Sequence, residues 1–90
     1  MLRITENFEN GDMVRLRLDG TLSLATFDEL VELCDRHQRE RHTLIIDLAG
    51  VNFMHDEAAR RLARMRGKSL RVINCSPFIT TLLDSVGRKD

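Results

Sequence analysis

Residues 43–48, TLIIDL, constrain the fold of this chain more than any other segment. The segment is almost continuously apolar rather than alternating, which is typical of a central strand covered on both faces. Residues 51–54 then lead into a helix pattern over residues 56–66, which Gly67 is expected to end. The sequence therefore predicts a buried strand followed directly by a helix.

The same alternation of strand and helix continues toward the C-terminus. Residues 70–73 form another short apolar segment, and Ser76-Pro77 marks the start of a last helix that runs to Gly87. Proline suits the first helical position because the N–H that it lacks would have no partner there. Strand–helix–strand units with short links favour parallel strands joined by right-handed crossovers.

The chain begins with the pattern of a β-hairpin. Leu2 and Ile4 alternate with polar residues, and Asn10-Gly11 is typical of a two-residue turn. Residues 14–18 alternate again, so the second strand is expected to end at Gly20. The predicted fold class is therefore α/β, with a mixed, mostly parallel sheet that starts with an N-terminal hairpin.

A helix is predicted after the hairpin. Thr26 and Glu29 have the spacing of a capping box, which places the helix start at Thr26. Apolar residues then recur at helical spacing and form one stripe that faces the core: Phe27, Leu30, Val31 and Cys34. The polar run over residues 36–42 is interpreted as the solvated end of this helix.

Length, charge and hydropathy exclude several classes of function. With 90 residues, the chain has room for one modest core and is expected to form a single domain, residues 1–90. Lys+Arg and Asp+Glu both number 14, so the net charge of +0 provides no attraction for nucleic acid or an anionic membrane. No apolar segment approaches the roughly 20 residues of a membrane span, and no signal peptide is recognisable. A cytoplasmic location without membrane insertion is expected.

No catalytic pattern is found in the sequence. Asp56 and Glu57 are neighbours at a helix start, so their side chains point in different directions and do not form an acid–base pair. Ser76 and Ser85 lack the surroundings of a nucleophile, and no glycine-rich phosphate loop is present. The sequence therefore predicts that the protein is not an enzyme and uses no cofactor.

No metal site is expected either. His37, His42 and His55 are scattered, and the first two are too far apart on a continuous helix to share a face. Cys34 and Cys75 have no paired spacing, so both are interpreted as free thiols.

Residues 52–61, NFMHDEAARR, concentrate charge at a strand–helix junction. Acidic residues in a first helical turn complement the helix dipole. The pairs Asp56–Arg60 and Glu57–Arg61 are expected to add about 0.2–0.5 kcal/mol each. The helix is outwardly basic through Arg60, Arg61, Arg64, Arg66 and Lys68. Two interpretations stay open from the residues alone, a solvated helix face and a docking surface.

The order of elements and several motifs resemble the STAS domain, the module of bacterial anti-sigma factor antagonists and of the cytoplasmic tails of sulfate transporters. Residues 14–22, VRLRLDGTL, are similar to the family's opening strand, and residues 44–54, LIIDLAGVNFM, to its central strand. Ser76-Pro77, followed by Leu82-Leu83 and Gly87, resembles the helix after the next strand. The resemblance covers about residues 12–87 and implies a STAS-like fold and a protein-interaction module that regulates transcription by partner switching.

The resemblance also implies a regulatory loop at the charged junction. In anti-sigma factor antagonists this loop reads Asp-Ser-Ser-Gly, and its first serine is phosphorylated by a partner kinase that is also the anti-sigma factor. The corresponding residues here are His55-Asp56-Glu57-Ala58, so Asp56 occupies the acceptor position. A phosphoserine would bring nearly two negative charges to a helix N-terminus, and Asp56 and Glu57 place fixed negative charge there. We therefore expect a module that serine phosphorylation does not switch.

The predicted partner is a protein related to an anti-sigma factor or serine kinase, docked on a surface that includes His55, Asp56, Glu57, Arg60, Arg61 and Arg64. Two alternatives stay open: the STAS subunit of an ABC-type lipid transport complex, bound to the ATPase, and a small-ligand sensor. The chain stops at Asp90, where many members add a strand and a helix. A sheet edge left uncovered in this way would invite pairing, including formation of a homodimer.

Overall fold

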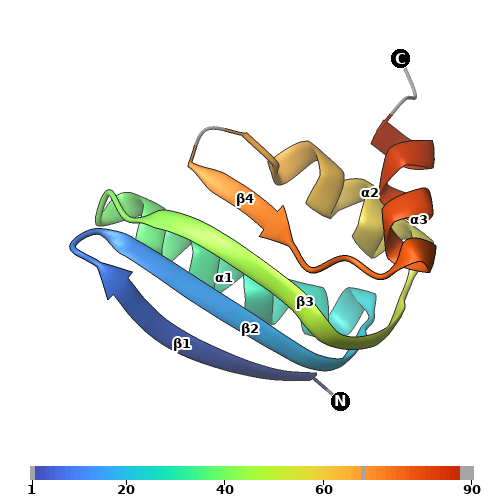
Figure 1. Cartoon of the computed structure of the whole chain (residues 1–90), viewed down its shortest axis with the longest axis horizontal. Helices are drawn as coiled ribbons and strands as arrows, with labels where there is room; N and C mark the ends of the chain where they lie inside the picture. Colours follow the sequence, from blue (N-terminus) through green and yellow to red (C-terminus); the bar gives the residue numbers. More distant parts are fainter. Residues whose placement is uncertain (1, 68, 88–90) are drawn as a thin grey trace.

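A four-stranded sheet forms the centre of the molecule (Figure 1). The computed structural model describes residues 2–67 and 69–87. Its strands are β1 (Leu2–Asn10), β2 (Met13–Leu22), β3 (Thr43–Met54) and β4 (Leu70–Ile73), in the spatial order β1-β2-β3-β4. β1 pairs with β2 in antiparallel orientation, whereas the β2–β3 and β3–β4 pairs are parallel. This confirms the predicted α/β class with a mixed, mostly parallel sheet.

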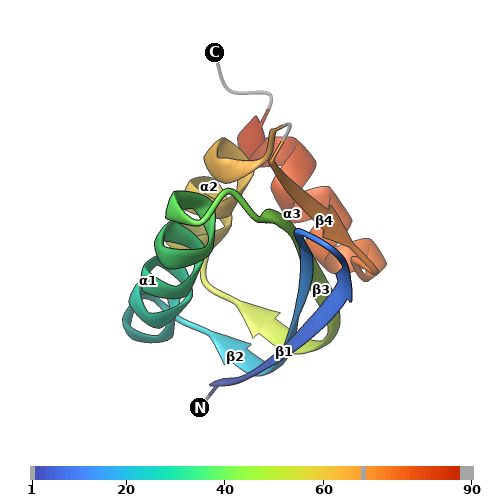
Figure 2. The ribbon, with the colours of Figure 1, turned by 90° about the vertical axis from the view of Figure 1, so that its left-hand side faces the viewer.

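Three helices follow β2, β3 and β4 in turn: α1 (Leu24–Arg39), α2 (Asp56–Met65) and α3 (Pro77–Gly87). α1 packs on β2 and β3, with α2 beside it, and α3 packs against α2 (Figure 2). The start of α3 follows the predicted pattern, since the Ser76 hydroxyl accepts a hydrogen bond from the Ile79 N–H at 3.2 Å. The sheet therefore carries its helix layer mainly on one face.

The core forms between this face and the helices. Val14, Leu16 and Leu18 of β2 are buried, and the register places Val14 opposite Leu44 and Leu16 opposite Ile46 of β3. Of the predicted helix stripe, Phe27, Leu30 and Cys34 are buried and Val31 is half-buried. β3 is central, as predicted, but Ile45 on the outward face stays half-exposed. The outward face of β3 is therefore not fully covered, contrary to the prediction that both faces of this strand are buried.

The hairpin differs from the prediction in its details. The two residues of the turn are Gly11 and Asp12, because Asn10 still pairs with Met13 and Gly11 adopts a φ of +51°. β2 continues beyond Gly20 to Leu22, since its final residues pair with the extended end of β3.

The start of α1 also differs from the prediction. Ser23 is the N-cap, and its hydroxyl accepts a hydrogen bond from the Thr26 N–H at 3.3 Å. The Thr26 hydroxyl is 2.8 Å from the Ser23 nitrogen and accepts its hydrogen. Thr26 is thus the N3 residue of the capping box rather than its N-cap, and Glu29 has no part in it.

The end of α1 folds back on itself: most of residues 36–42 are exposed, as predicted, but His37 is buried and His42 half-buried. α1 ends at Arg39, and Arg41 adopts a φ of +64°. The His42 N–H then donates to the His37 carbonyl at 2.9 Å, and the Arg41 N–H to the Gln38 carbonyl at 3.0 Å. These two bonds form a Schellman motif, which turns the chain back over the last helical turn. His37 is only 4% exposed as a result.

Candidate functional site

The charged junction is rigidly tied to the sheet. His55 has extended backbone angles and is the N-cap of α2, and its Nδ1 accepts the Glu57 N–H at 3.1 Å. The His55 N–H donates to the carbonyl of Leu22, at the end of β2, at 3.0 Å. A histidine therefore fills the capping role that serine, threonine or aspartate usually fills, and its ring is fixed at this junction.

The acidic residues of the junction have different surroundings. Glu57 pairs with Arg61, the Nε and Oε2 atoms being 3.4 Å apart, as predicted. The predicted Asp56–Arg60 pair is wrong, because Arg60 also turns to Glu57, with its Nε 3.8 Å from Oε1. Within the described residues, no ion pair reaches Asp56, which is exposed in the first turn of α2. Asp56 therefore offers a free carboxylate beside the helix N-terminus.

Ala58 is not part of the exposed surface. It is fully buried in the core together with Ala59 and Leu62 of the same helix. Of the four residues that correspond to the family's regulatory loop, Ala58 therefore cannot contact a partner directly, whereas His55 and Asp56 are exposed and Glu57 is half-exposed. A buried position explains the small side chain there, since α2 packs against α3 and lies beside α1.

Exposed apolar side chains lie at the same end of the sheet as Asp56. Parallel strands end at one edge, so β2, β3 and β4 all lead into helix N-termini on the right of Figure 1. Leu24, Phe53 and Phe78 lie at these three strand–helix connections and are 38%, 51% and 58% exposed. We call Leu24, Phe53, His55, Asp56 and Phe78 the carboxyl edge. Its three apolar members were not predicted from the sequence, although each lies within three residues of a helix start.

The predicted basic surface of α2 is divided by the structure. Arg61 and Arg64 line a groove of 440 Å³ between α1 and α2, across from Asp28 and Asp35 of α1. Arg60 is exposed but is not among the residues that line this groove. Arg61 and Arg64 therefore face acidic residues of α1 across the groove, whereas Arg60 lies outside the groove lining.

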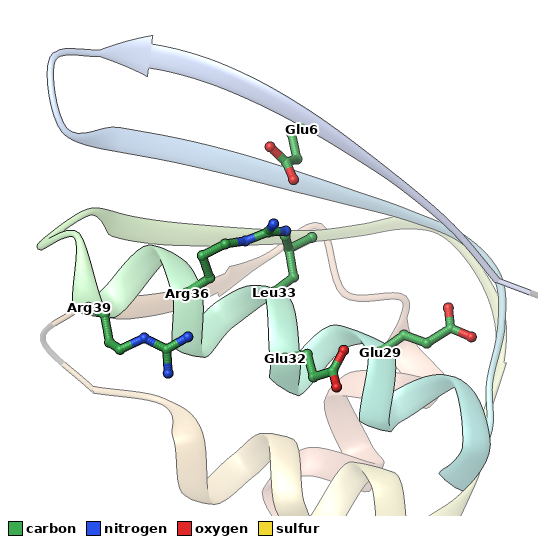
Figure 3. A pocket seen from close by; sticks show the side chains of 6 residues that line it. All are labelled: Glu6, Glu29, Glu32, Leu33, Arg36 and Arg39. Atoms are coloured by element: carbon green, nitrogen blue, oxygen red, sulfur yellow. The ribbon is translucent and has the colours of Figure 1, made fainter.

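A larger groove, of 530 Å³, lies between β1 and α1 (Figure 3). Its lining is Glu6, Glu29, Glu32, Leu33, Arg36 and Arg39. Leu33 and Arg36 point from α1 toward Glu6 of β1, whereas the two glutamates of α1 point along the groove. Sites for small organic ligands are mainly apolar. A groove with one apolar side chain is therefore a poor match for a bound nucleotide or acyl chain.

Asp47 is buried on the outward face of the sheet, where it is only 4% exposed. Burial alone would raise the pKa of this carboxyl. Hydrogen bonds from Asn74 Nδ2 and the Ala49 N–H, both at 3.0 Å, together with the charges of Arg15 and Arg17, outweigh burial and lower the pKa below its ordinary value. Asn74 reaches this position from the end of β4 with a φ of +58°. Asp47 thus joins β3 to the segment after β4.

Both cysteines are free thiols, as predicted. Burial, with the nearby Asp35 carboxylate, raises the pKa of Cys34 to about 12. Burial also raises the pKa of the half-buried Cys75. Since the thiolate is the reactive form, neither residue has the lowered pKa of a catalytic or redox cysteine.

Among the described residues, no helix combines the length and the apolar character that crossing a bilayer requires. No curated protein matches the sequence. Among solved structures, the unphosphorylated form of the anti-sigma factor antagonist SpoIIAA is similar, with a TM-score of 0.69 and 19% sequence identity. The match covers 91% of this chain and 82% of that one, and it shows that the two share a fold. The model of the STAS domain family matches residues 5–89. The chain therefore belongs to the STAS domain family.

Proposed function

We propose that this STAS domain is a non-enzymatic interaction module that binds a protein partner through the carboxyl edge, in the manner of an anti-sigma factor antagonist. The observation that carries the proposal is the combination of Phe53 and Asp56 at one strand–helix junction, an exposed ring three residues before an exposed carboxylate without an ion pair among the described residues. Exposed aromatic side chains supply much of the binding energy at protein interfaces. A nearby charge sets the orientation of the partner and selects against wrong partners.

The proposed binding is not switched by serine phosphorylation. Residues 55–58 contain no hydroxyl group, and the acceptor position holds Asp56. The carboxylate of Asp56 keeps negative charge at the N-terminus of α2, where free amides and the helix dipole favour it. The acceptor position of the family's regulatory loop therefore cannot gain a phosphate on serine in this chain. A change in partner binding when any serine of the native protein is phosphorylated would contradict this part of the proposal.

A matched pair of double variants tests the docking surface. Phe53→Ser with Asp56→Lys changes the carboxyl edge, whereas Phe8→Ser with Asp35→Lys makes the same changes at an exposed phenylalanine and an exposed aspartate elsewhere. We expect the first pair to weaken partner capture from the native source by about tenfold or more, because loss of an interface anchor costs about 2 kcal/mol. The control pair should bind normally, and circular dichroism should show both proteins folded, with a lower thermal midpoint for the edge variant because Lys at position 56 opposes the helix dipole.

The identity of the captured protein decides the class of partner. A serine kinase of the anti-sigma factor type supports the proposal in full. If the unmodified protein captures an ABC-type ATPase and the edge variant does not, the result supports the docking surface. The partner then belongs to a lipid transport complex. Normal capture by the edge variant, or loss with the control pair alone, would show that the proposed surface is wrong. A small molecule without any protein would overturn the proposal of a protein partner.

A further inference from the structure

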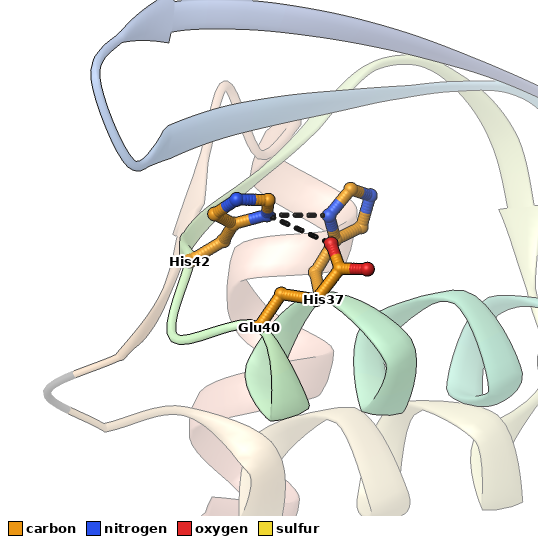
Figure 4. A group of neighbouring side chains, drawn as sticks. All are labelled: His37, Glu40 and His42. Atoms are coloured by element: carbon orange, nitrogen blue, oxygen red, sulfur yellow. Dashed lines mark hydrogen bonds and ion pairs between the residues drawn. The ribbon is translucent and has the colours of Figure 1, made fainter.

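Two histidines and a glutamate meet where α1 ends and β3 begins (Figure 4). The Nδ1 atoms of His37 and His42 are 2.9 Å apart and share a hydrogen bond, which an ion bound to both nitrogens would replace, and Glu40 Oε1 is 3.7 Å from His42 Nδ1. All three ligand atoms lie within 4.8 Å of one another. The Schellman motif causes this meeting, because it returns His42 to the side of α1 that carries His37. The expectation that His37 and His42 stay apart holds only for a continuous helix, and α1 ends between them.

We propose that His37 Nδ1, His42 Nδ1 and Glu40 form a binding site for a divalent transition-metal ion, with zinc as the ion of choice. Imidazole nitrogen suits Zn²⁺, Ni²⁺, Co²⁺ and Cu²⁺, and a carboxylate completes common zinc sites. Three protein ligands leave one position of a tetrahedral ion for water or for a side chain of a partner.

The distances fit such an ion with small adjustments. For metal–ligand bonds of about 2.05 Å, nitrogens 2.9 Å apart subtend about 90° at the ion, and a separation of about 3.3 Å gives the tetrahedral angle. The 3.7 Å between His42 and Glu40 corresponds to about 130°. A movement of a few tenths of an ångström at His42 reconciles these two angles, and the Glu40 carboxylate must also come within about 4 Å of His37 Nδ1, the largest separation that two such bonds can span. His42 follows the helix and Glu40 is exposed, so both can adjust, while His37 stays fixed in the protein.

The surroundings of His37 are those of a metal ligand held by a second residue. His37 is buried, and its Nε2 has no hydrogen-bond partner within the described residues. The nearest carboxylate is Glu6 of β1, whose Oε1 is 3.7 Å from that nitrogen. Metal binding at Nδ1 places the proton of a neutral imidazole on Nε2, where it can be donated to a carboxylate that orients the ring. With an ion bound at Nδ1, the buried Nε2 of His37 would be the nitrogen that donates its hydrogen toward Glu6.

Two further features favour a cation at this place. The ring of Phe8 meets the rings of His37 and His42 edge-on, with centroids 5.9 Å and 5.7 Å away, and limits the orientations that both imidazoles can adopt. The site also lies at the C-terminus of α1, where the helix dipole favours positive charge. A bound ion would tie β1 and the start of β3 to the end of α1. The metal site lies at the opposite end of β3 from the carboxyl edge. Failure of one proposal therefore does not affect the other.

Titration of the untagged protein with zinc chloride in a reducing buffer tests the site. We expect calorimetry to give one ion per chain, and Co²⁺ to give a visible spectrum without a thiolate charge-transfer band. Nitrogen-detected NMR of the imidazoles should show the Nδ1 resonances of His37 and His42 move with zinc while those of His55 stay in place. His42→Ala should weaken binding by at least about tenfold and Glu6→Gln by about tenfold, within the range of 10–100-fold reported for losses of outer partners.

His55→Asn is the matched control, because it removes the remaining histidine and asparagine can still cap α2. It should bind zinc as the unmodified protein does. Circular dichroism identifies any variant that has lost its fold, and Glu40→Gln, at an exposed position, then replaces His42→Ala as the ligand variant. Absence of stoichiometric binding, unchanged affinity in a folded ligand variant, or equal loss in His55→Asn would each overturn the proposal.

Discussion

Phe27→Ala is expected to lower the free energy of unfolding by about 3–5 kcal/mol. Phe27 is the largest side chain that is fully buried, at 1% exposure, and it lies in the first turns of α1 against the sheet. Truncation removes apolar burial and leaves a cavity that a rigid sheet cannot fill. A domain of this size has a stability of about 5–15 kcal/mol, so the loss is a large share of the total. Chemical denaturation monitored by circular dichroism measures it.

Phe53→Ala makes the same chemical change at an exposed ring and is the control. Its free energy of unfolding should fall by less than about 1 kcal/mol, because about half of the ring already contacts water. Its effect should instead appear in partner binding. Equal destabilisation by the two variants would contradict the described core and the status of Phe53 as a surface residue.

Asp47→Ala is expected to cost about 2–4 kcal/mol, since it leaves the Asn74 amide and the Ala49 N–H without their acceptor in a buried place. Arg15, whose Nη1 is 3.7 Å from Asp47 Oδ2, would also lose a charge partner. The contribution of Arg15 is smaller because its own side chain is partly exposed. Asp47→Asn keeps an oxygen in position and should cost less than the alanine variant. An alanine variant as stable as the unmodified protein would show that this network contributes nothing.

The same carboxylate predicts the response to acid. Its pKa is lowered in the folded protein, so its contribution is complete above the unfolded-state pKa of about 3.9 and is lost as pH falls through the folded value. The difference in stability between the unmodified protein and Asp47→Asn should therefore shrink as the pH is lowered below about 4. Denaturation curves at several pH values measure this difference. A difference that grows in acid would contradict the lowered pKa.

The sequence predicted the parts of the fold that depend on local pattern. Alternation identified the buried face of β2, and the Ser76-Pro77 pair marked the start of α3. The burial of Asp47 could not be predicted in this way, because its partner Asn74 is 27 residues away and reaches it only through the pairing of β3 with β4. The predicted start of α1 at Thr26 was wrong. Ser23 and Thr26 both have side chains that can cap a helix and lie three positions apart, so the sequence alone did not show which of them is the N-cap.

The candidate site was predicted only in part. The junction at His55 and Asp56 was found because charge at a helix start is visible in sequence. Phe53 and Phe78 were missed, since exposure depends on which helices cover a strand end. The meeting of His37 and His42 was excluded on the assumption of a continuous helix, and a positive φ at Arg41 is a feature that no periodicity reveals.

The proposed docking of a protein partner at the carboxyl edge is tested most directly by site-specific photocrosslinking in native cells. A photoreactive phenylalanine analogue replaces Phe53 in one strain and Phe8, an exposed ring on β1, in another. The account predicts a crosslinked adduct with one partner protein from position 53 and none from position 8. An adduct from position 8 and none from position 53 would contradict the proposed docking surface. The absence of an adduct at position 53, in cells that contain a partner captured by the unmodified protein, would contradict it as well.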